Sequence, residues 1–255
     1  STCVPTLSIA PINTHADDTY LIIPAFNVRT CAAEIAHIED WALKNNLTLN
    51  RVKSMEIVFV SPRSRRDVTV PPPAVPGIVR TESLKVLGVT LNRRFSVEQH
   101  ITHLLASCAQ TLFALRTLRN HGLPTTALHI IFQATVVAKL CYASPAWWGF
   151  TSAADRGRLE AFLRRAVQFG YRDASAPSLT SLFEQADDKL FHSILCNSRH
   201  LLYSLLPPKR TEHYSLRERA HNLQLSIRTS ALCDNNFIIR SLFKDICSSQ
   251  FSQVV

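Results

Sequence analysis

The stretch SVEQHITHLLASCAQTLFALRTL, residues 96–118, decides the fold of the larger part of the chain. Apolar residues recur along it at every third or fourth position, which is the spacing of a helix with one buried face. This apolar stripe consists of Ile101, Leu104, Leu105, Cys108, Leu112, Leu115 and Leu118. Ser96 and Gln99 have the spacing of a capping box at a helix start, and Gly122 and Pro124 end the pattern. The spacing therefore predicts a long amphipathic helix.

Helical spacing continues beyond that stretch. Further helices are expected over about 126–142, after Ser152, from near Ser181 to the break at Pro207, and over 231–247. The helix after Ser152 is expected to turn Leu159, Phe162, Leu163, Ala166 and Phe169 inward. Trp147 and Trp148 are predicted to anchor a helix end in the core. Asp187 and Asp188 are predicted to lie on a solvated helix face.

Residues 1 to about 95 have a different, mixed pattern. Short apolar runs predict strands over 20–23, 55–60 and 84–91, and a helix is expected to begin after Thr30. Strands interleaved with one helix indicate an α+β fold. The chain is therefore expected to join an α+β region to a helical one.

Composition favours an intracellular protein with a polyanionic partner. The chain has 28 Lys and Arg against 19 Asp and Glu, a net charge of +9, and 46% apolar residues, enough to form a core. An ordinary basic protein is the alternative. The seven cysteines are scattered without a C-x-x-C pair, which argues against a disulfide framework or a zinc knuckle. No stretch is expected to span a membrane.

An acidic pair, Asp17-Asp18, precedes the first predicted strand. At a hairpin turn two neighbouring carboxylates can approach one point, where they could bind Mg²⁺, an ion that prefers oxygen ligands. Adjacent carboxylates are common, and a solvated surface pair is the alternative. The sequence around the pair decides between the two interpretations.

Four blocks of sequence, in order, resemble the reverse transcriptases of non-LTR (LINE-type) retrotransposons. Ala16-Asp17-Asp18-Thr19 resembles the x-D-D motif, and LTLNRVKS, residues 47–54, is similar to the L-x-L-N-x-x-K-[ST] block. Leu87-Gly88-Val89 looks like the L-G-[IV] primer grip, and residues 95–101 resemble the start of the thumb helix that follows it.

The resemblance implies a role for each matching residue. Asp17 would bind the Mg²⁺ ions of two-metal nucleotidyl transfer, with Asp18 supporting it, and Lys53 would lie near the leaving pyrophosphate. Gly88 would let the backbone approach the primer strand. A solvated lysine and a strand bulge are the alternatives for Lys53 and Gly88.

The resemblance also implies an organisation: a partial polymerase palm over 1–95, a helical thumb over 96–172 and a helical C-terminal region over 173–255. Its partners would be an RNA template, a DNA primer and deoxynucleotides, in the nucleus or cytoplasm. The family's palm uses another aspartate from an upstream strand, and no aspartate precedes Asp17. His15 stands where the family usually has Tyr or Phe. The chain alone is therefore expected not to polymerise DNA, although its parent would be an RNA-directed DNA polymerase.

Clustered basic residues are expected to contact phosphates with little sequence preference. The three clusters are Arg51, Lys53, Arg63, Arg65 and Arg66; Arg93 and Arg94; and Arg156, Arg158, Arg164, Arg165 and Arg172. Arginines that only keep a surface soluble are the alternative.

Two other functions stay open. One is a non-enzymatic nucleic-acid-binding relic of such an element. The other follows from residues 104–140, which resemble an N-terminal segment of an AlkB-type tRNA-modifying oxygenase. That enzyme needs an iron site of two histidines and a carboxylate. His37-Ile38-Glu39 has part of that pattern, but a solvated helix face is the expected interpretation.

Overall fold

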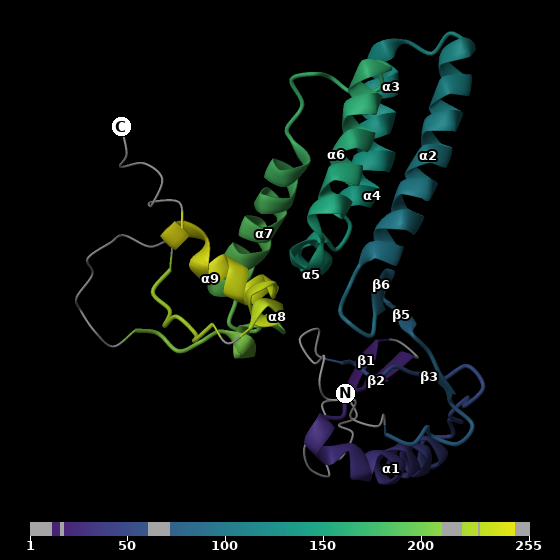
Figure 1. Cartoon of the computed structure of the whole chain (residues 1–255), viewed down its shortest axis with the longest axis vertical. Helices are drawn as coiled ribbons and strands as arrows, with labels where there is room; N and C mark the ends of the chain where they lie inside the picture. The colour runs from purple at the N-terminus through teal and green to yellow at the C-terminus, as the bar shows by residue number, and fades with distance from the viewer. Residues whose placement is uncertain (1–11, 16–17, 61–71, 211–220, 229, 248–255) are drawn as a thin grey trace. The chain divides into compact units, whose positions relative to one another are not determined.

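The computed structural model describes residues 12–15, 18–60, 72–210, 221–228 and 230–247 (Figure 1). It confirms a mixed α+β fold that is mainly helical, with a few short strands. The chain divides into two compact units. Unit 1 comprises residues 1–84 and 92–94, and unit 2 comprises residues 85–91 and 95–255.

Unit 1 begins with an antiparallel hairpin of β1 (Ile12–His15) and β2 (Asp18–Leu21). His15 lies opposite Asp18, so two residues connect the strands. The strand predicted over 20–23 thus begins two residues earlier and ends at Leu21. Ile22 lies beyond the strand and is exposed.

A helical segment follows, formed by η1 (Ala25–Thr30) and α1 (Cys31–Lys44). Thr30 is at the predicted N-cap position of α1, but its hydroxyl donates to the Asn27 carbonyl oxygen at 2.9 Å and does not cap the helix. Ile35 and Ala42 form the buried face of α1. They lie seven residues apart, the spacing of two helical turns.

The other pairing in unit 1 joins β3 (Met55–Glu56) and β4 (Val79–Arg80), which are parallel. The strand predicted over 55–60 is therefore only two residues long. Backbone bonds still fix the segment that follows, because the Val60 amide donates to the Arg93 carbonyl oxygen at 2.9 Å.

The single strand predicted over 84–91 is wrong. The segment is a hairpin of β5 (Ser83–Val86) and β6 (Val89–Asn92). Leu87 and Gly88 connect the strands with φ of +46° and +90°, and positive φ at both central residues marks a type I′ turn. The usual signal for this turn is Asn-Gly. Because leucine stands in the first position, the apolar run continues through the turn, and the sequence pattern does not reveal it.

Unit 2 is a set of helices, in which α3 and α4 follow each other end to end and lie beside α2 and α6 (Figure 1). Its elements are α2 (Glu98–Asn120), α3 (Thr125–Phe132), the π-helical η2 (Gln133–Val137), α4 (Ala138–Cys141), α5 (Ser144–Trp147), η3 (Trp148–Phe150), α6 (Ala153–Gln168), α7 (Leu179–Cys196), η4 (Tyr203–Leu205), α8 (Ala231–Asp234) and α9 (Phe237–Cys247).

The long helix predicted over 96–118 is confirmed as α2, but the predicted capping box is not. The helix begins at Glu98, and the buried Val97 takes the N-cap position. Ser96 Oγ accepts from the Glu98 amide at 3.3 Å, which gives a local turn in place of a cap. A capping box does exist at the start of α6, where Ser152 and Asp155 bond reciprocally.

The core of unit 2 follows the predicted stripes with two exceptions. The confirmed buried residues include Ile101, Leu104, Cys108 and Leu115 of α2 and Leu159, Phe162, Leu163 and Ala166 of α6. Leu118, in the last turn of α2, is exposed. Phe169 is also exposed because α6 ends at Gln168, so Phe169 no longer follows the helical spacing. Trp147 and Trp148 are buried against Phe183, which confirms their predicted anchoring role.

The prediction that Asp187 and Asp188 lie on a solvated face is wrong for Asp187, whereas Asp188 is exposed as predicted. α9 packs on α7, and Arg240 Nη2 donates to Asp187 Oδ2 at 2.8 Å, where the Asp187 side chain is only 13% exposed. Lys244 Nζ lies 2.6 Å from Asp188 Oδ1. The partner helix is distant in sequence, so the periodicity of α7 alone could not reveal this contact. α7 also ends at Cys196, well before the break predicted at Pro207.

The expectation that no stretch could span a membrane is also corrected. The run Thr125–Phe150 is long and apolar enough to do so by length and composition. In this structure its side chains at Leu128, Phe132, Val136 and Leu140 lie in the core of unit 2. Packing of the helices therefore accounts for the apolar character of these positions.

Candidate nucleic-acid interface

Of the acidic pair, the structure describes only Asp18, which lies in the β1–β2 hairpin. Asp17 lies outside the described residues, and Asp18 opens β2 with an exposed side chain. Within the described part of the chain, no group of three or more His, Cys, Asp or Glu side chains could hold a metal ion. The Mg²⁺ site at Asp17 and Asp18 stays a prediction.

Lys53 lies in a turn that Asn50 organises. The Lys53 amide donates to Asn50 Oδ1 at 3.1 Å, and the Ser54 hydroxyl donates to the Asn50 carbonyl oxygen at 2.9 Å. The Lys53 side chain is exposed. These bonds give a local reason for the Asn and Ser of the block over 47–54: they shape the turn that presents the lysine.

Arg51, in the same block, is engaged inside unit 1. Its Nε and Nη2 donate to the two carboxylate oxygens of Glu39 at 2.6 and 2.8 Å, and Nη1 donates to the Pro76 carbonyl oxygen at 2.9 Å. The hydrogen bond from Arg51 lowers the pKa of Glu39. Glu39 therefore neutralises Arg51, and the same pairing occupies the carboxylate of the His37-Ile38-Glu39 pattern.

Among the other predicted basic residues of unit 1, one is paired with a carboxylate and one is exposed. Arg93 Nη1 lies 3.0 Å from Glu82 Oε1, while Arg94 is exposed. Arg63, Arg65 and Arg66 lie outside the described residues. Arg80, which the sequence did not single out, donates Nε and Nη2 to Glu56 at 3.0 Å each. Paired glutamates thus cancel much of the positive charge of the described part of unit 1.

On α6, two of the predicted arginines are engaged with neighbours in unit 2. Arg156 stacks on Trp148, with the guanidinium carbon 4.6 Å from the ring centroid, and donates Nε to Thr151 Oγ1 at 2.9 Å. Arg158 donates to Asp155 Oδ1 at 3.3 Å and to Thr102 Oγ1 of α2 at 2.9 Å. Both side chains therefore help to join structural elements.

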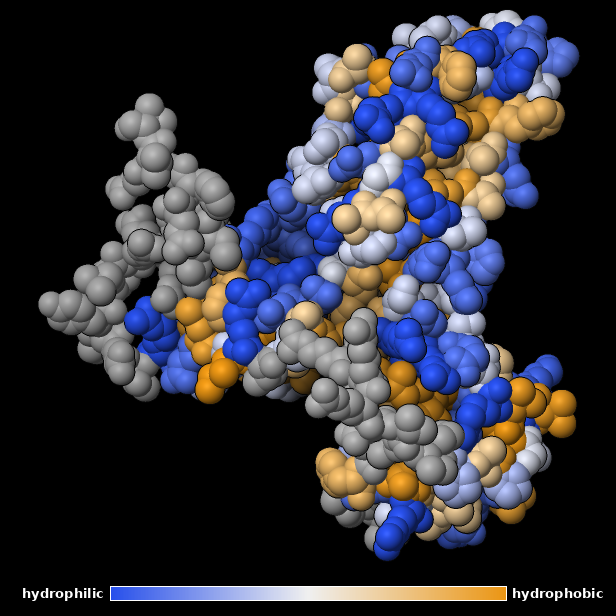
Figure 2. All heavy atoms as spheres, viewed as in Figure 1, coloured by the Kyte–Doolittle hydropathy of each residue, from blue (hydrophilic) through white to orange (hydrophobic). Residues whose placement is uncertain are grey.

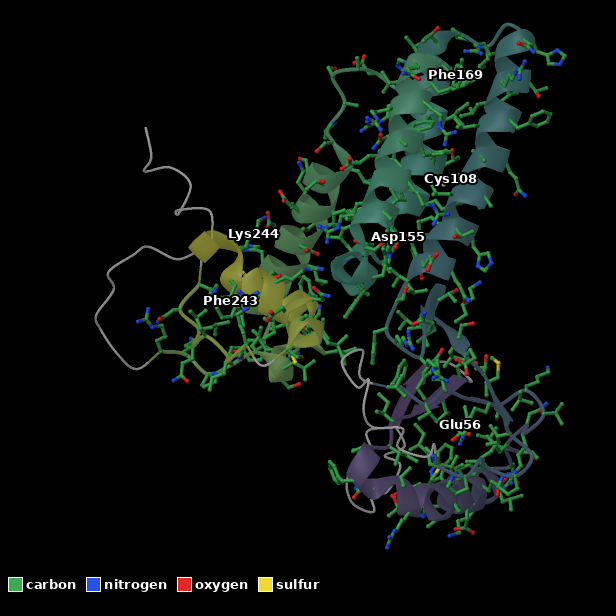
Figure 3. The ribbon with its side chains drawn as sticks, viewed as in Figure 1. Glu56, Cys108, Asp155, Phe169, Phe243 and Lys244 are labelled. Carbon is green, nitrogen blue, oxygen red and sulfur yellow. The ribbon has the colours of Figure 1, made fainter. Side chains whose placement is uncertain are left out.

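Arg164 and Arg165 are different. Both are exposed near the C-terminal end of α6, and within the described residues neither side chain has a hydrogen bond or an ion pair. Figure 3 labels Asp155 and Phe169 towards the two ends of this helix. These two guanidinium groups are available to an external anion.

Arg172, assigned by sequence to the same cluster, does not belong to it. Its side chain is buried and Nη2 donates to the Pro177 carbonyl oxygen. Burial lowers the pKa of this guanidinium. The residue lies in the turn that follows α6, so the exposed face of the helix does not extend to it.

Positive charge concentrates in the region that contains α2 to α6. Residues 95–172 contain eight Lys or Arg and three Asp or Glu, whereas residues 173–255 contain nine and eight. Figure 2 shows hydrophilic side chains over much of the visible face of these helices. Arg172 is buried, but the remaining excess of positive charge attracts phosphates, whose counterions are released on binding.

The hairpin tip in unit 2 has a partner that the sequence did not indicate. Tyr142, the residue after α4, donates its hydroxyl to the Leu87 carbonyl oxygen at 3.1 Å. A Cβ at Gly88 would lie 3.1 Å from Tyr142 Cε1, so the space left by Gly88 accommodates this ring. Gly88 therefore serves both the turn and the tyrosine. The two segments are 55 residues apart, and no spacing rule connects them.

Basic groups also gather beside this hairpin. The imidazole of His100, at the start of α2, is buried and meets the Trp147 ring edge-on at 5.2 Å between centroids. Burial lowers the pKa of His100, and nearby His103 and Lys85 lower it further. Lys85 belongs to β5, so the hairpin places a lysine close enough to the start of α2 to affect His100.

No protein-family model, curated protein or solved structure matches this chain.

Proposed function

We propose that the chain binds nucleic acid through the α2 to α6 region, as the thumb-like part of a non-LTR reverse transcriptase. The observation that supports this proposal is the exposure of Arg164 and Arg165, without internal partners in the described residues, in a region with eight basic and three acidic residues. A guanidinium group matches a phosphate in charge and geometry.

Contacts of this kind give affinity without base specificity. Arginine and lysine bind the phosphodiester backbone, which is the same at every nucleotide. A template-copying enzyme needs such contacts because it must move along any sequence. Binding is accordingly expected to be strong at low salt and to weaken steeply as salt rises.

The test is the affinity of the purified chain for a labelled RNA–DNA hybrid, measured by fluorescence anisotropy over a range of NaCl concentrations. Each phosphate contact is expected to contribute a slope of roughly −0.7 to −0.9 to log K against log [NaCl]. Hybrids of unrelated sequence should bind alike. Undetectable binding at low salt, or binding that ignores salt, would contradict the proposal.

A second candidate concerns the parent protein, as an RNA-directed DNA polymerase. What supports it is the β1–β2 hairpin, in which Asp18 opens β2 and only two residues separate it from His15. In that enzyme Asp17 and Asp18 would hold Mg²⁺, which would activate the primer hydroxyl towards the deoxynucleotide, and Lys53 would lie near the departing pyrophosphate.

Primer extension tests this candidate. The longer parent protein is expected to extend a primer on an RNA template with Mg²⁺, and Asp17→Ala is expected to abolish extension while leaving hybrid binding in place. Extension by the Asp17→Ala protein at the wild-type rate would rule out this assignment. The chain alone is expected to bind without extending.

A further inference from the structure

We propose that the C-terminal end of α6 binds single-stranded nucleic acid, with the Phe169 ring stacked on an unpaired base and Arg164 and Arg165 on the neighbouring phosphates. This inference rests on the proposed nucleic-acid binding and adds the class of strand that the site takes and a residue that contacts a base. Figure 3 labels Phe169 at this end of the helix.

The first observation is that the Phe169 side chain is exposed, although it is aromatic and follows a helix with a buried face. It is 57% exposed and belongs to neither hydrophobic core of the described residues. Tyr171, two residues later, is buried in the core of unit 2. Tyr171 therefore provides the core packing at this turn, and more than half of the Phe169 surface faces solvent.

The second observation is that the backbone at Phe169 has a fixed conformation. Phe169 is the C-cap residue of α6. The Gly170 amide donates to the Val167 carbonyl oxygen at 2.9 Å. The Tyr171 amide donates to the Ala166 carbonyl oxygen, also at 2.9 Å. These two bonds form a Schellman motif, and Gly170 has the left-handed φ of +71° that the motif requires.

Side chains from two other helices hold the same turn. Arg119 of α2 donates Nη1 to the Phe169 carbonyl oxygen at 2.6 Å, and its guanidinium carbon lies 4.6 Å from the Tyr171 ring centroid. His129 Nε2 of α3 lies 3.2 Å from the Gly170 carbonyl oxygen. Because the backbone is already fixed, the Phe169 ring loses little conformational freedom when it binds a partner.

The third observation is that two available cations lie next to this ring in the chain. The Phe169 amide donates to the Arg165 carbonyl oxygen at 3.0 Å, so the two residues are one helical turn apart, about 5.4 Å along the axis. Arg164 precedes Arg165 directly. Both side chains are exposed, and within the described residues neither has a hydrogen bond or an ion pair.

This combination of groups favours a single strand as the partner. Phosphates suit the two guanidinium groups, and the flat face of a base suits the ring. A base offers its face only where it is not stacked inside a duplex. An anion without bases would leave the ring exposed, and an apolar protein segment would leave both cations without a counterion. Single-stranded nucleic acid satisfies the ring and the cations together.

An abasic strand separates the two kinds of contact, because it keeps the phosphates and lacks the bases. The probes are a labelled single-stranded DNA oligonucleotide and an abasic oligonucleotide of the same length, with affinities for the full chain measured by fluorescence anisotropy. The wild-type chain is expected to bind the oligonucleotide with bases about fivefold or more tightly than the abasic one.

Phe169→Ala is expected to remove this preference. Its affinity for the oligonucleotide with bases should fall about fivefold or more, and its affinity for the abasic strand should not change. The slope of log K against log [NaCl] should also stay the same, because no cation is lost. Affinity for a fully paired RNA–DNA hybrid should be nearly unaffected, since the bases of the hybrid are stacked on one another.

Two further substitutions at the same position separate stacking from apolar contact and from folding. Phe169→Trp keeps an aromatic face and should retain the preference, whereas Phe169→Leu keeps an apolar side chain and should lose most of it. This comparison holds even if Phe169→Ala lowers the melting temperature. Phe26→Ala, which removes a 78% exposed ring from η1 of unit 1, is the matched control and should change neither affinity.

The outcomes distinguish this inference from the proposed function. Equal binding of the two oligonucleotides by the wild-type chain, or equal loss on both in Phe169→Ala, would overturn the base contact. Retained preference in Phe169→Leu would show that stacking is not the cause. In each case salt-dependent binding of the hybrid would leave the proposed function standing. Absence of binding to every probe would overturn both.

Discussion

Arginines that look equivalent in the sequence have different environments in the two units. In unit 1, Arg51, Arg80 and Arg93 each pair with a glutamate, at positions 39, 56 and 82 respectively. In unit 2, Arg164 and Arg165 lie exposed on α6, and within the described residues they have no carboxylate partner. The first group contributes little net charge, whereas the second presents two positive charges to solvent.

The difference shows that a count of basic residues does not identify a binding surface. The glutamate partners in unit 1 lie 12, 24 and 11 residues from their arginines, so they are not visible as local charge pairs. Whether an arginine is available to a phosphate depends on which carboxylates the fold brings to it. The two exposed arginines of α6 therefore support the proposal that unit 2 binds phosphates.

The largest effect should come from removing the core beneath α6. Leu159→Ala deletes a fully buried side chain and should destabilise unit 2 by about 2–5 kcal/mol. Urea unfolding measures the loss, and hybrid binding should fall with it. Leu43→Ala, at an exposed position in α1 of unit 1, is the control and should change stability by less than about 0.5 kcal/mol. If the two variants bound the hybrid equally well, the exposed arginines of α6 would not depend on this core.

A buried arginine pair in unit 2 gives the next largest effect. Arg240→Ala leaves the carboxylate of Asp187 buried and unpaired, and should cost about 3 kcal/mol in urea unfolding. Lys244→Ala breaks the neighbouring, more exposed pair with Asp188 and should cost less than about 1 kcal/mol. If both variants lost the same stability, burial would not determine how much each ion pair contributes to the stability of unit 2.

Lowering the pH should reduce the free energy of unfolding of unit 2, because His100 is buried at the start of α2. The folded-state pKa of His100 lies below its ordinary value of 6.5, so the unfolded chain takes up the proton first. The contribution of His100 is therefore fully present above about pH 6.5 and decreases as the pH falls below it. Chemical unfolding across this range measures the effect. His100→Gln should flatten the dependence, and the control His121→Gln, at an exposed site at the other end of α2, should not.

The smallest effect should come from removing the glutamate partner of Arg51, which leaves this arginine free to bind a phosphate. Glu39→Gln removes the partner of Arg51 and should raise affinity for the hybrid by no more than about threefold. Glu34→Gln, also on α1, makes the same change in net charge and controls for it. An equal increase in both variants would mean that overall charge, and not release of Arg51, determines the gain.

The sequence predicted the helices well because their cores follow a local period. The buried residues of α2 and α6 fall at helical spacing, and the exceptions, Leu118 and Phe169, lie at helix ends. The hairpin over 83–92 was missed because Leu87 hides a turn inside an apolar run. The tip of this hairpin is bonded to Tyr142, which lies 55 residues away from Leu87, so no local pattern could indicate the contact.

The candidate site is harder to predict, because it also depends on contacts between segments that are distant in the sequence. The exposure of Arg164 and Arg165 agrees with the phosphate-binding interpretation of their cluster, but Arg172 of that cluster is buried. Asp187 was expected on a solvated face, yet α9 covers it. Contacts between distant segments decide each case, and one sequence read by periodicity does not contain them.

The most direct test compares two matched double variants in the salt dependence of hybrid binding. Arg164→Ala with Arg165→Ala should make the slope of log K against log [NaCl] shallower by roughly 1.5 to 2, because two phosphate contacts are lost. Arg51→Ala with Arg93→Ala removes the same charge from unit 1 and should leave the slope unchanged. The opposite pattern, or equal changes in both proteins, would contradict the assignment of nucleic-acid binding to α6.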